Sequence, residues 1–265
     1  MRLKGKVAIV TGGGRGIGKA IALAFAAEGA SVVVASRNME NLKKVVAEIE
    51  SRGGKALAIQ TDVTVEEQVE HMVKQTVDTF GRIDILVNNS GIGGVTCPVV
   101  DLKLEDWLEV INVDLTGAML CTKHTLKYMI PQRSGVIINI AAEGGRAGDG
   151  RAGYPLRAPY CCAKMGLIGL TETVAVEVGK YGIRVNAISP AAVRGERLEN
   201  VLKARAQALG RPYEELMAKI AEDYSLGRIV EEHEVAAVAV FLASDEASAI
   251  TGQTIPVHCG HHINF

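Results

Sequence analysis

Short apolar runs alternate along the chain with longer segments in which apolar residues recur every three or four positions. The short runs are rich in valine and isoleucine, as expected for β-strands. We expect strands at Val7–Val10, Ser31–Ala35, Ala56–Gln60, Ile83–Val87, Gly135–Ile140, Arg184–Ile188 and Thr254–Val257. Because these runs are nearly continuous rather than alternating, they indicate a sheet buried on both faces.

The segments between these runs have the periodicity of amphipathic helices. The expected helices are Gly18–Glu28, Met39–Arg52, Glu66–Phe80, Leu104–Ile130, Tyr160–Tyr181 and Glu231–Leu242. Alternating strands and helices predict an α/β fold, a single doubly wound domain over residues 1–265 with a parallel β-sheet flanked by helices. No linker or low-complexity tract divides the sequence.

Residues 194–228 break this alternation. The segment is charged, has a helical composition and is interrupted by Gly210 and Pro212. It follows the sixth expected strand, and open α/β sheets bind ligands beyond the carboxyl ends of their strands. We therefore expect a substrate lid at about 194–228, with an interaction arm as the alternative.

Composition excludes several classes of function. A net charge of −1 favours neither nucleic acid nor an acidic membrane surface as a partner. The longest apolar run, Val235–Ala243, is far shorter than the roughly 20 residues of a membrane-spanning helix. Five cysteines without metal-ligand spacing, and an N-terminal stretch without signal-peptide character, predict a soluble cytoplasmic protein.

A glycine-rich turn, TGGGRGIG at Thr11–Gly18, follows the first expected strand and opens the first helix. Its spacing differs from G-x-G-x-x-G, and the useful glycines are Gly12, Gly16 and Gly18. Glycines permit a tight turn and a close approach of backbone N–H groups to phosphate, and a helix N-terminus favours negative charge. In a strand–turn–helix unit, this motif predicts a nucleotide site.

The end of the second expected strand indicates which nucleotide binds. A NAD site would place an acidic residue there for the ribose 2′-hydroxyl, but the sequence has Ser36 and Arg37. A hydroxyl and a guanidinium suit a 2′-phosphate, and Arg15 adds a second positive charge. We predict NADP(H) as the preferred cofactor, with NAD(H) as the alternative. A solvated loop arginine is the non-functional explanation of Arg37.

Five motifs, in this order, resemble those of the short-chain dehydrogenase/reductase family. They are TGGGRGIG, Asp62-Val63, NNSG at Asn88–Gly91, YCCAK at Tyr160–Lys164 and IRVNAISP at Ile183–Pro190. The resemblance covers nearly the whole chain and implies a Rossmann-type fold, a nicotinamide cofactor, a small-molecule carbonyl or alcohol substrate and a homotetramer. The cofactor-binding residues that we predict are Gly12, Gly14, Arg15, Gly16, Ile17, Gly18, Ser36, Arg37, Asp62, Val63, Asn89, Gly91, Tyr160, Lys164, Pro190 and Val193.

Tyr160 and Lys164 are separated by one helical turn and therefore share a face of the helix. A neighbouring ammonium favours the phenolate form of a tyrosine, which suits proton transfer. The resemblance implies that Tyr160 protonates the carbonyl oxygen during reduction and that Lys164 also holds the nicotinamide ribose. The alternative is a surface tyrosine and lysine on an ordinary helix.

Aligned on the family pattern, the chain departs from it at catalytic positions. Ala142 stands where the family has a serine that hydrogen-bonds the substrate oxygen, and Asp114 stands where it has a proton-relay asparagine. Pro190-Ala191 and Gly195 replace a Pro-Gly and a later threonine. Removing one donor to a developing oxyanion costs about 10²–10³ in rate, so we expect another residue to supply it.

The loop between Ala142 and Tyr160 is longer than the family pattern and offers replacement donors. The candidate substrate-binding residues are Glu143, Arg146, Tyr154 and Arg157 on this loop, with Arg194 beyond the sixth strand. Tyr154 offers a hydroxyl, an arginine polarises a carbonyl, and convergent arginines would favour an anionic substrate. An oligomer contact or a solvated turn is the alternative role of this loop.

The final segment, PVHCGHHINF, contains three histidines and a cysteine within five residues. Such a cluster looks metal-binding, but the surrounding sequence has no companion motif. We therefore predict no metal site and favour a tail that packs at a subunit interface.

Three functions are compatible with these motifs. The first is an NADP(H)-dependent oxidoreductase in which Tyr160 is the general acid and base and Lys164 supports it. The second keeps the nucleotide but does not consume it, and performs elimination, hydration or epimerisation with Asp114 or Glu143 as base. The third is a binding protein that senses NADP(H) without turnover, and the intact tyrosine and lysine argue against it.

Overall fold

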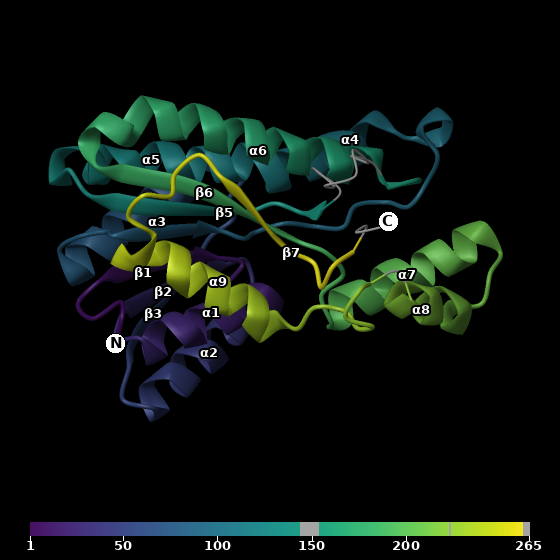
Figure 1. Cartoon of the computed structure of the whole chain (residues 1–265). Coiled ribbons are helices and arrows are strands. Elements are labelled where there is room, and N and C mark those ends of the chain that lie inside the picture. Colours follow the sequence, from purple (N-terminus) through teal and green to yellow (C-terminus); the bar gives the residue numbers. More distant parts are fainter. Residues whose placement is uncertain (144–153, 223, 262–265) are drawn as a thin grey trace.

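The computed structural model describes residues 1–143, 154–222 and 224–261, so Arg146 lies outside the described residues. One parallel sheet of seven strands, in the order β3-β2-β1-β4-β5-β6-β7, runs through the described part of the chain (Figure 1). The strands are β1 (Val7–Thr11), β2 (Ser31–Ser36), β3 (Lys55–Gln60), β4 (Ile85–Asn88), β5 (Gly135–Ile140), β6 (Ile183–Pro190) and β7 (Thr254–Val257). Because every pairing is parallel, all strands end at the same edge.

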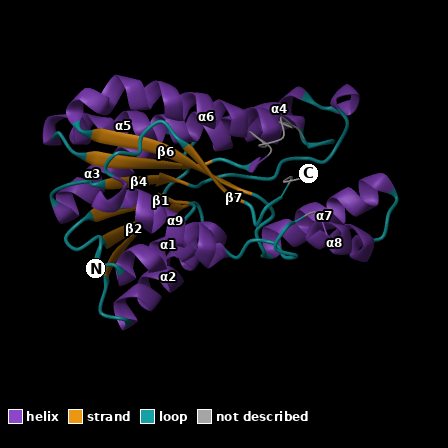
Figure 2. Cartoon of the chain, viewed as in Figure 1, coloured by secondary structure: helices purple, strands orange, loops and turns teal. Residues whose placement is uncertain are grey.

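Helices cover both faces of the sheet (Figure 2). One face carries α1 (Gly16–Ala27), α2 (Met39–Ser51) and α9 (Glu232–Ala243), and the other carries α3 (Glu66–Phe80), α5 (Gly117–Gln132) and α6 (Ala158–Val178). Along β1, Val10 points into the first apolar core with Phe25, whereas Ile9 points into the second with Met72. Both faces of the strand are buried, which explains the continuous apolar runs in the sequence.

The α/β fold predicted from the sequence is confirmed. All the expected strands are present, with boundaries shifted by a few residues at most. The helix expected over Leu104–Ile130 is present as a continuous helical stretch, in which a π-helical turn at Asn112–Thr116 joins α4 (Leu104–Ile111) to α5. Asp114 lies in this turn and is fully buried. Such turns are frequent at functional sites, and the helical sequence pattern continues through this one without a break.

The carboxyl edge of the sheet contains a topological switch point. β1 and β4 are neighbours, although β2 and β3 lie between them in the sequence. A reversal of strand order leaves a crevice at the carboxyl ends of the two strands. Beyond this edge, α7 (Glu196–Leu209) and α8 (Tyr213–Glu222) extend away from the layered body, within the insertion at 194–228 (Figure 1).

None of the described helices combines the length and the apolar character needed to cross a bilayer.

Candidate active site

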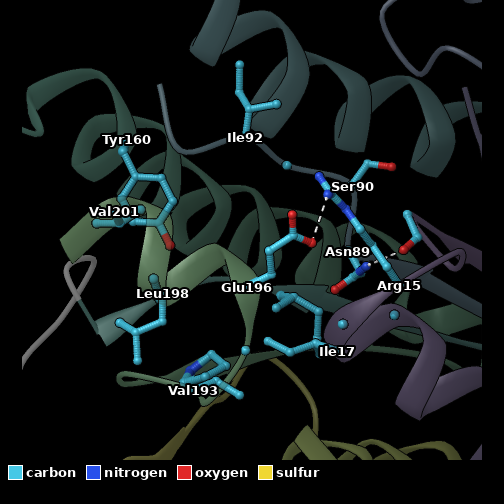
Figure 3. Close-up of a pocket in the computed structure, with 18 of the residues that line it drawn as sticks. Arg15, Ile17, Asn89, Ser90, Ile92, Tyr160, Val193, Glu196, Leu198 and Val201 are labelled. Atoms are coloured by element: carbon cyan, nitrogen blue, oxygen red, sulfur yellow. Dashed lines mark hydrogen bonds and ion pairs between the residues drawn. The ribbon is translucent and has the colours of Figure 1, made fainter. Parts of the chain in front are cut away.

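A pocket with a volume of about 850 Å³ lies at the carboxyl edge of the sheet. Its walls come from the glycine-rich turn, the segments that follow β2, β4, β5 and β6, and the helices α6 and α7. Figure 3 shows Arg15 and Asn89 on one side of the pocket, and Tyr160, Leu198 and Val201 on the other. The pocket therefore joins the predicted nucleotide turn to the predicted catalytic tyrosine.

Close packing requires glycine in the glycine-rich turn. A Cβ atom on Gly18 would lie 2.3 Å from the carbonyl oxygen of Gly12 and 2.4 Å from Nδ2 of Asn89. Gly12 and Gly16 have φ values of +64° and +58°, which residues with a side chain rarely adopt. Arg15, the N-cap residue of α1, makes no side-chain capping hydrogen bond. The first N–H groups of α1 are therefore suited to an anionic ligand.

Thr11 and Asn89 hold this turn against the end of β4. Thr11 Oγ1 accepts hydrogen bonds from the backbone N–H groups of Asn89 at 3.0 Å and of Ser90 at 3.1 Å. Asn89 Nδ2 donates to the carbonyl oxygens of Thr11 at 2.9 Å and of Gly12 at 3.3 Å. These hydrogen bonds hold the end of β1 and the end of β4 together at the wall of the pocket.

Ser36, Arg37 and Asp62 line the pocket at the ends of β2 and β3. Asp62 Oδ1 accepts hydrogen bonds from the backbone N–H of Thr64 at 3.0 Å and from its hydroxyl at 2.7 Å. Burial disfavours the ionised carboxylate, but these hydrogen bonds and the charge of Arg37 outweigh burial and keep the pKa of Asp62 below its usual value. Arg37 therefore brings positive charge to this end of the pocket.

Ion pairs connect α7 and its preceding loop to the nucleotide end of the pocket. Arg15 lies 3.7 Å from Glu196 at the start of α7, and both side chains are largely exposed (Figure 3). Arg194 Nε donates to Glu231 Oε1 at 2.8 Å. Exposed pairs of this kind contribute at most about 1 kcal/mol. Neither pair therefore fixes its arginine strongly in one position.

At the other end of the pocket, α6 presents Tyr160 and Lys164. Lys164 Nζ donates a hydrogen bond to the carbonyl oxygen of Ile140 at 2.9 Å and lies 3.4 Å from Asp114 Oδ2. The same nitrogen is 5.7 Å from the centroid of the Tyr160 ring. Asp114 Oδ1 accepts a hydrogen bond from the N–H of Ile92 at 2.7 Å, which orients the carboxylate. Because Lys164 is 3% exposed and Asp114 is fully buried, their ion pair is shielded from water.

Arg157 is a second cation beside Tyr160. Its guanidinium carbon lies 4.5 Å from the centroid of the tyrosine ring, within the range of a cation–π interaction. Arg157 is the N-cap residue of α6, three positions before Tyr160, and it is buried. Two buried cations, Lys164 and Arg157, therefore lie beside the ring of Tyr160.

Ala142 and Tyr154 also line the pocket. Ala142 is buried and brings only a methyl group to the wall. Burial, followed by the negative charge of Glu143, raises the pKa of Tyr154 above its usual value. The Tyr154 hydroxyl therefore stays protonated around neutral pH and can donate a hydrogen bond.

The pocket brings the residues predicted from the sequence together. Those that line it are Gly12, Gly14, Arg15, Gly16, Ile17, Gly18, Ser36, Arg37, Asp62, Val63, Asn89, Gly91, Ala142, Glu143, Tyr154, Arg157, Tyr160, Lys164, Pro190, Val193 and Arg194. Asp114 stands behind this wall, against Lys164. Arg146 is a candidate outside the described residues.

Sequence reasoning missed several residues of the pocket wall, among them Arg205, Tyr224 and His261. Arg205 lies on α7, where the helical pattern did not show which face meets the pocket. His261 belongs to the C-terminal histidine cluster, which the sequence analysis considered only as a possible metal site or a subunit contact. Its ring instead packs within its own chain. Across the described residues, no group of three or more His, Cys, Asp or Glu side chains is placed to hold a metal ion.

The architecture is that of a Rossmann-type α/β protein, with its pocket at the switch point of a parallel sheet. Residues 12–262 match the family model described as Enoyl-(Acyl carrier protein) reductase. The chain belongs to the short-chain dehydrogenase/reductase family.

Relatives and solved structures align with nearly the whole of this chain. It is 44% identical over 260 residues to the 3-oxoacyl-[acyl-carrier-protein] reductase of Synechocystis, covering 97% of each chain. It is 38% identical to the meso-2,3-butanediol dehydrogenase of Serratia marcescens, covering 98% of this chain and 96% of that one. A structure of NAD⁺-bound xylitol dehydrogenase superposes with a TM-score of 0.93 at 34% identity, over 98% of this chain and 100% of that one. A variant actinorhodin polyketide ketoreductase with NADPH gives 0.90 at 34% identity, over 98% of each chain. The relatives are oxidoreductases.

Proposed function

We propose that the protein is an NADP(H)-dependent oxidoreductase that interconverts a ketone or aldehyde and an alcohol, with Tyr160 as general acid and base. The observation that carries this proposal is the position of Tyr160 beside the cations of Lys164 and Arg157, in the pocket that also contains the glycine-rich turn. Relatives named as reductases and dehydrogenases support the same class of reaction.

The described residues fit a nicotinamide dinucleotide. Crowding at Gly18, and the uncapped N–H groups of α1, suit a diphosphate that approaches the backbone closely. Ser36 and Arg37 would hold a 2′-phosphate, and Lys164 would hold the nicotinamide ribose. When bound, the nicotinamide supplies or accepts the hydride.

The residues around Tyr160 account for the proton. During reduction, Tyr160 donates its hydroxyl proton to the carbonyl oxygen as negative charge develops there. Lys164 and Arg157 stabilise the phenolate that remains, and Asp114 holds Lys164 in place. During oxidation, the same phenolate accepts the proton of the alcohol.

We further propose that Ala142 and Asp114 replace the family's serine and asparagine, and that Tyr154 supplies the missing hydrogen bond to the substrate oxygen. Asp114 can hold Lys164 in position, because its carboxylate binds both the ammonium of Lys164 and the backbone N–H of Ile92. Ala142 has no polar group, whereas the Tyr154 hydroxyl is a donor that burial keeps protonated.

Replacing Tyr154 by phenylalanine should lower kcat by about 10² because one donor to the developing oxyanion is lost. The loss should be the same at about pH 6 and about pH 9, since a raised pKa keeps the hydroxyl protonated across this range. Steady-state kinetics at both pH values measure it, with Tyr181→Phe as the matched control outside the pocket. An unchanged kcat would remove Tyr154 as the donor.

One solved relative is named with NAD⁺ and another with NADPH, so their names do not decide between the two cofactors. The proposal of NADP(H) therefore rests on Arg37. Arg37→Ala should weaken NADPH binding about tenfold or more, since charge-assisted hydrogen bonds contribute about 1.5–3 kcal/mol. NADH affinity should change by less than about twofold, because NADH lacks the 2′-phosphate that Arg37 would contact. Fluorescence titration measures both, and Arg52→Ala is the control. Wild-type protein that binds NADH tenfold tighter than NADPH would contradict the proposal.

The segment at 194–228 is proposed to be the substrate lid. Leu198, Val201 and Leu202 on α7 line the pocket, and Figure 3 shows the first two on the same side of it as Tyr160. Apolar side chains at this place would cover the reacting carbonyl and exclude water from it.

The test of the proposed function is a screen that follows NADPH absorbance with varied carbonyl compounds. Turnover by the wild type, and its loss in Tyr160→Phe, would support hydride transfer. Product formed without net consumption of the nucleotide would favour a lyase or epimerase instead.

A further inference from the structure

Arg205 brings a charged side chain to the part of the pocket wall that α7 forms. It follows Leu198, Val201 and Leu202 at helical spacing, so the four residues share one face of α7, and all of them line the pocket. Figure 3 shows Leu198 and Val201 on the same side of the pocket as Tyr160. Arg205 therefore lies on the pocket face of α7, one helical turn after Val201.

Val201 connects this face of α7 with the surroundings of the proposed acid. A Cβ atom on Gly93 would lie 3.6 Å from Val201 Cγ2 and 3.8 Å from Arg157 Nη2, so these two side chains approach the same point. The guanidinium carbon of Arg157 is in turn 4.5 Å from the centroid of the Tyr160 ring. One turn of an α-helix rises about 5.4 Å. Arg205 therefore lies about one helical turn along α7 from a side chain in the neighbourhood of Tyr160.

The guanidinium of Arg205 has an unused donor. Its Nε is buried and has no hydrogen-bond partner in the part of the chain that the structure describes. The helix supplies no counterion either, because the residues three and four positions away are the apolar Val201, Leu202, Ala208 and Leu209. Buried donors without an acceptor are rare in native structures because they destabilise the fold. A ligand that brings an acceptor into the pocket would satisfy this donor.

The carboxylates of the pocket wall have other neighbours. Those among the described residues are Asp62, Glu143, Glu196 and Glu232. Asp62 and Glu196 lie at the nucleotide end, near Arg37 and Arg15. Glu232 Oε1 is also there, 3.7 Å from the place of a Cβ atom on Gly16, and Glu143 Oε2 lies 2.6 Å from His261 Nδ1. The positive charge of Arg205 is therefore not neutralised by these acids.

We infer that Arg205 is a specificity-determining residue, and that the substrate is an oxo acid, in which a short hydrocarbon segment separates the reacting carbonyl from a carboxylate. This inference rests on the proposed function. The Nε–H and one Nη–H of a guanidinium are parallel donors that match the two oxygens of a carboxylate. With the carbonyl at Tyr160 and the carboxylate at Arg205, the hydrocarbon segment contacts the apolar side chains of Val201 and Leu202.

The experiment compares 4-oxopentanoate, 5-oxohexanoate and 6-oxoheptanoate with their methyl esters at about pH 7, where the acids are ionised. Each ester keeps the ketone and the chain length but has no charge. Wild-type kcat/KM should be at least about tenfold higher for one or more of the acids than for the matching ester. Arg205→Met removes the charge and keeps an unbranched side chain. It should lower this acid-to-ester ratio to about 1–3 and change kcat/KM for the ester by less than about threefold.

Lys203→Met is the matched control. Lys203 is on the same helix but does not line the pocket, and its Nζ lies 3.9 Å from Glu199. The control therefore removes the same charge from α7 without changing the pocket wall. Because both of these side chains are largely exposed, their interaction is weak, and the acid-to-ester ratio should stay within about twofold of the wild-type value.

The outcomes separate the inference from the proposed function. A preference for an acid that is lost in Arg205→Met and kept in Lys203→Met, with unchanged NADPH binding as the sign of an intact fold, supports the inference. It is overturned if the wild type prefers no acid over its ester, if the preference survives in Arg205→Met, or if that variant loses activity equally with acid and ester. Reduction of other carbonyl compounds but of none of these probes also overturns it, and in all these cases the proposed function stands. Absence of NADPH oxidation with every carbonyl compound overturns the proposed function itself, and the inference with it.

Discussion

Replacing Tyr160 by phenylalanine is expected to lower kcat/KM for carbonyl reduction by about 10²–10⁴, the usual contribution of a positioned general acid. The change removes one oxygen atom and leaves the ring that Arg157 and Lys164 contact. NADPH affinity should therefore stay within about threefold of the wild-type value. Stopped-flow or steady-state absorbance measures the rate, and fluorescence titration measures the binding.

Tyr128→Phe is the matched control for this experiment, because Tyr128 is an exposed residue of α5 away from the pocket. It should keep the wild-type rate. If Tyr160→Phe retained a third or more of wild-type activity, a group other than Tyr160 would be the acid, and the proposed mechanism would be wrong.

The second large effect concerns Lys164. Lys164→Met keeps most of the side-chain volume but leaves the fully buried carboxylate of Asp114 without its cation. Breaking a buried ion pair in this way typically costs about 3–5 kcal/mol. We expect a loss of this size in the free energy of unfolding measured with urea, together with loss of reductase activity.

A double variant separates the structural role of Lys164 from the chemical one. Asn at position 114 is neutral, so Asp114→Asn combined with Lys164→Met should recover most of the lost stability, because no unpaired charge remains buried. Activity should not recover, since the ammonium beside Tyr160 is still missing. Recovery of activity together with stability would show that Lys164 acts only as a counterion of Asp114.

Much of the fold was predictable because the sheet is buried on both of its faces. A central parallel strand such as β1 faces apolar cores on both sides, so its sequence is continuously apolar and easy to recognise. The π-helical turn between α4 and α5 was not predictable, because it changes the backbone over a few residues without interrupting the helical pattern. Asp114 owes its contact with Lys164 to the packing of that turn against α6.

The nucleotide end of the pocket was predictable for a related reason. This part of the pocket wall is built largely from the backbone around Gly12, Gly16 and Gly18, whose positions follow from one strand and the helix after it. The substrate end depends on residues far apart in the sequence. Arg205 comes from α7, and Arg157 is recognisable as a partner of Tyr160 only from the position of its guanidinium over the ring.

The sequence by itself determined the parallel sheet, the glycine-rich turn and the one-turn spacing of Tyr160 and Lys164, because each depends on local geometry within a strand or a helix. Only the tertiary structure decided the partner of Asp114 and the partner of His261. His261 and Glu143 are 118 positions apart and meet only because the strand ends converge at one edge of the sheet. Sequence spacing carries no information about such a contact, whereas chain topology and side-chain packing specify it.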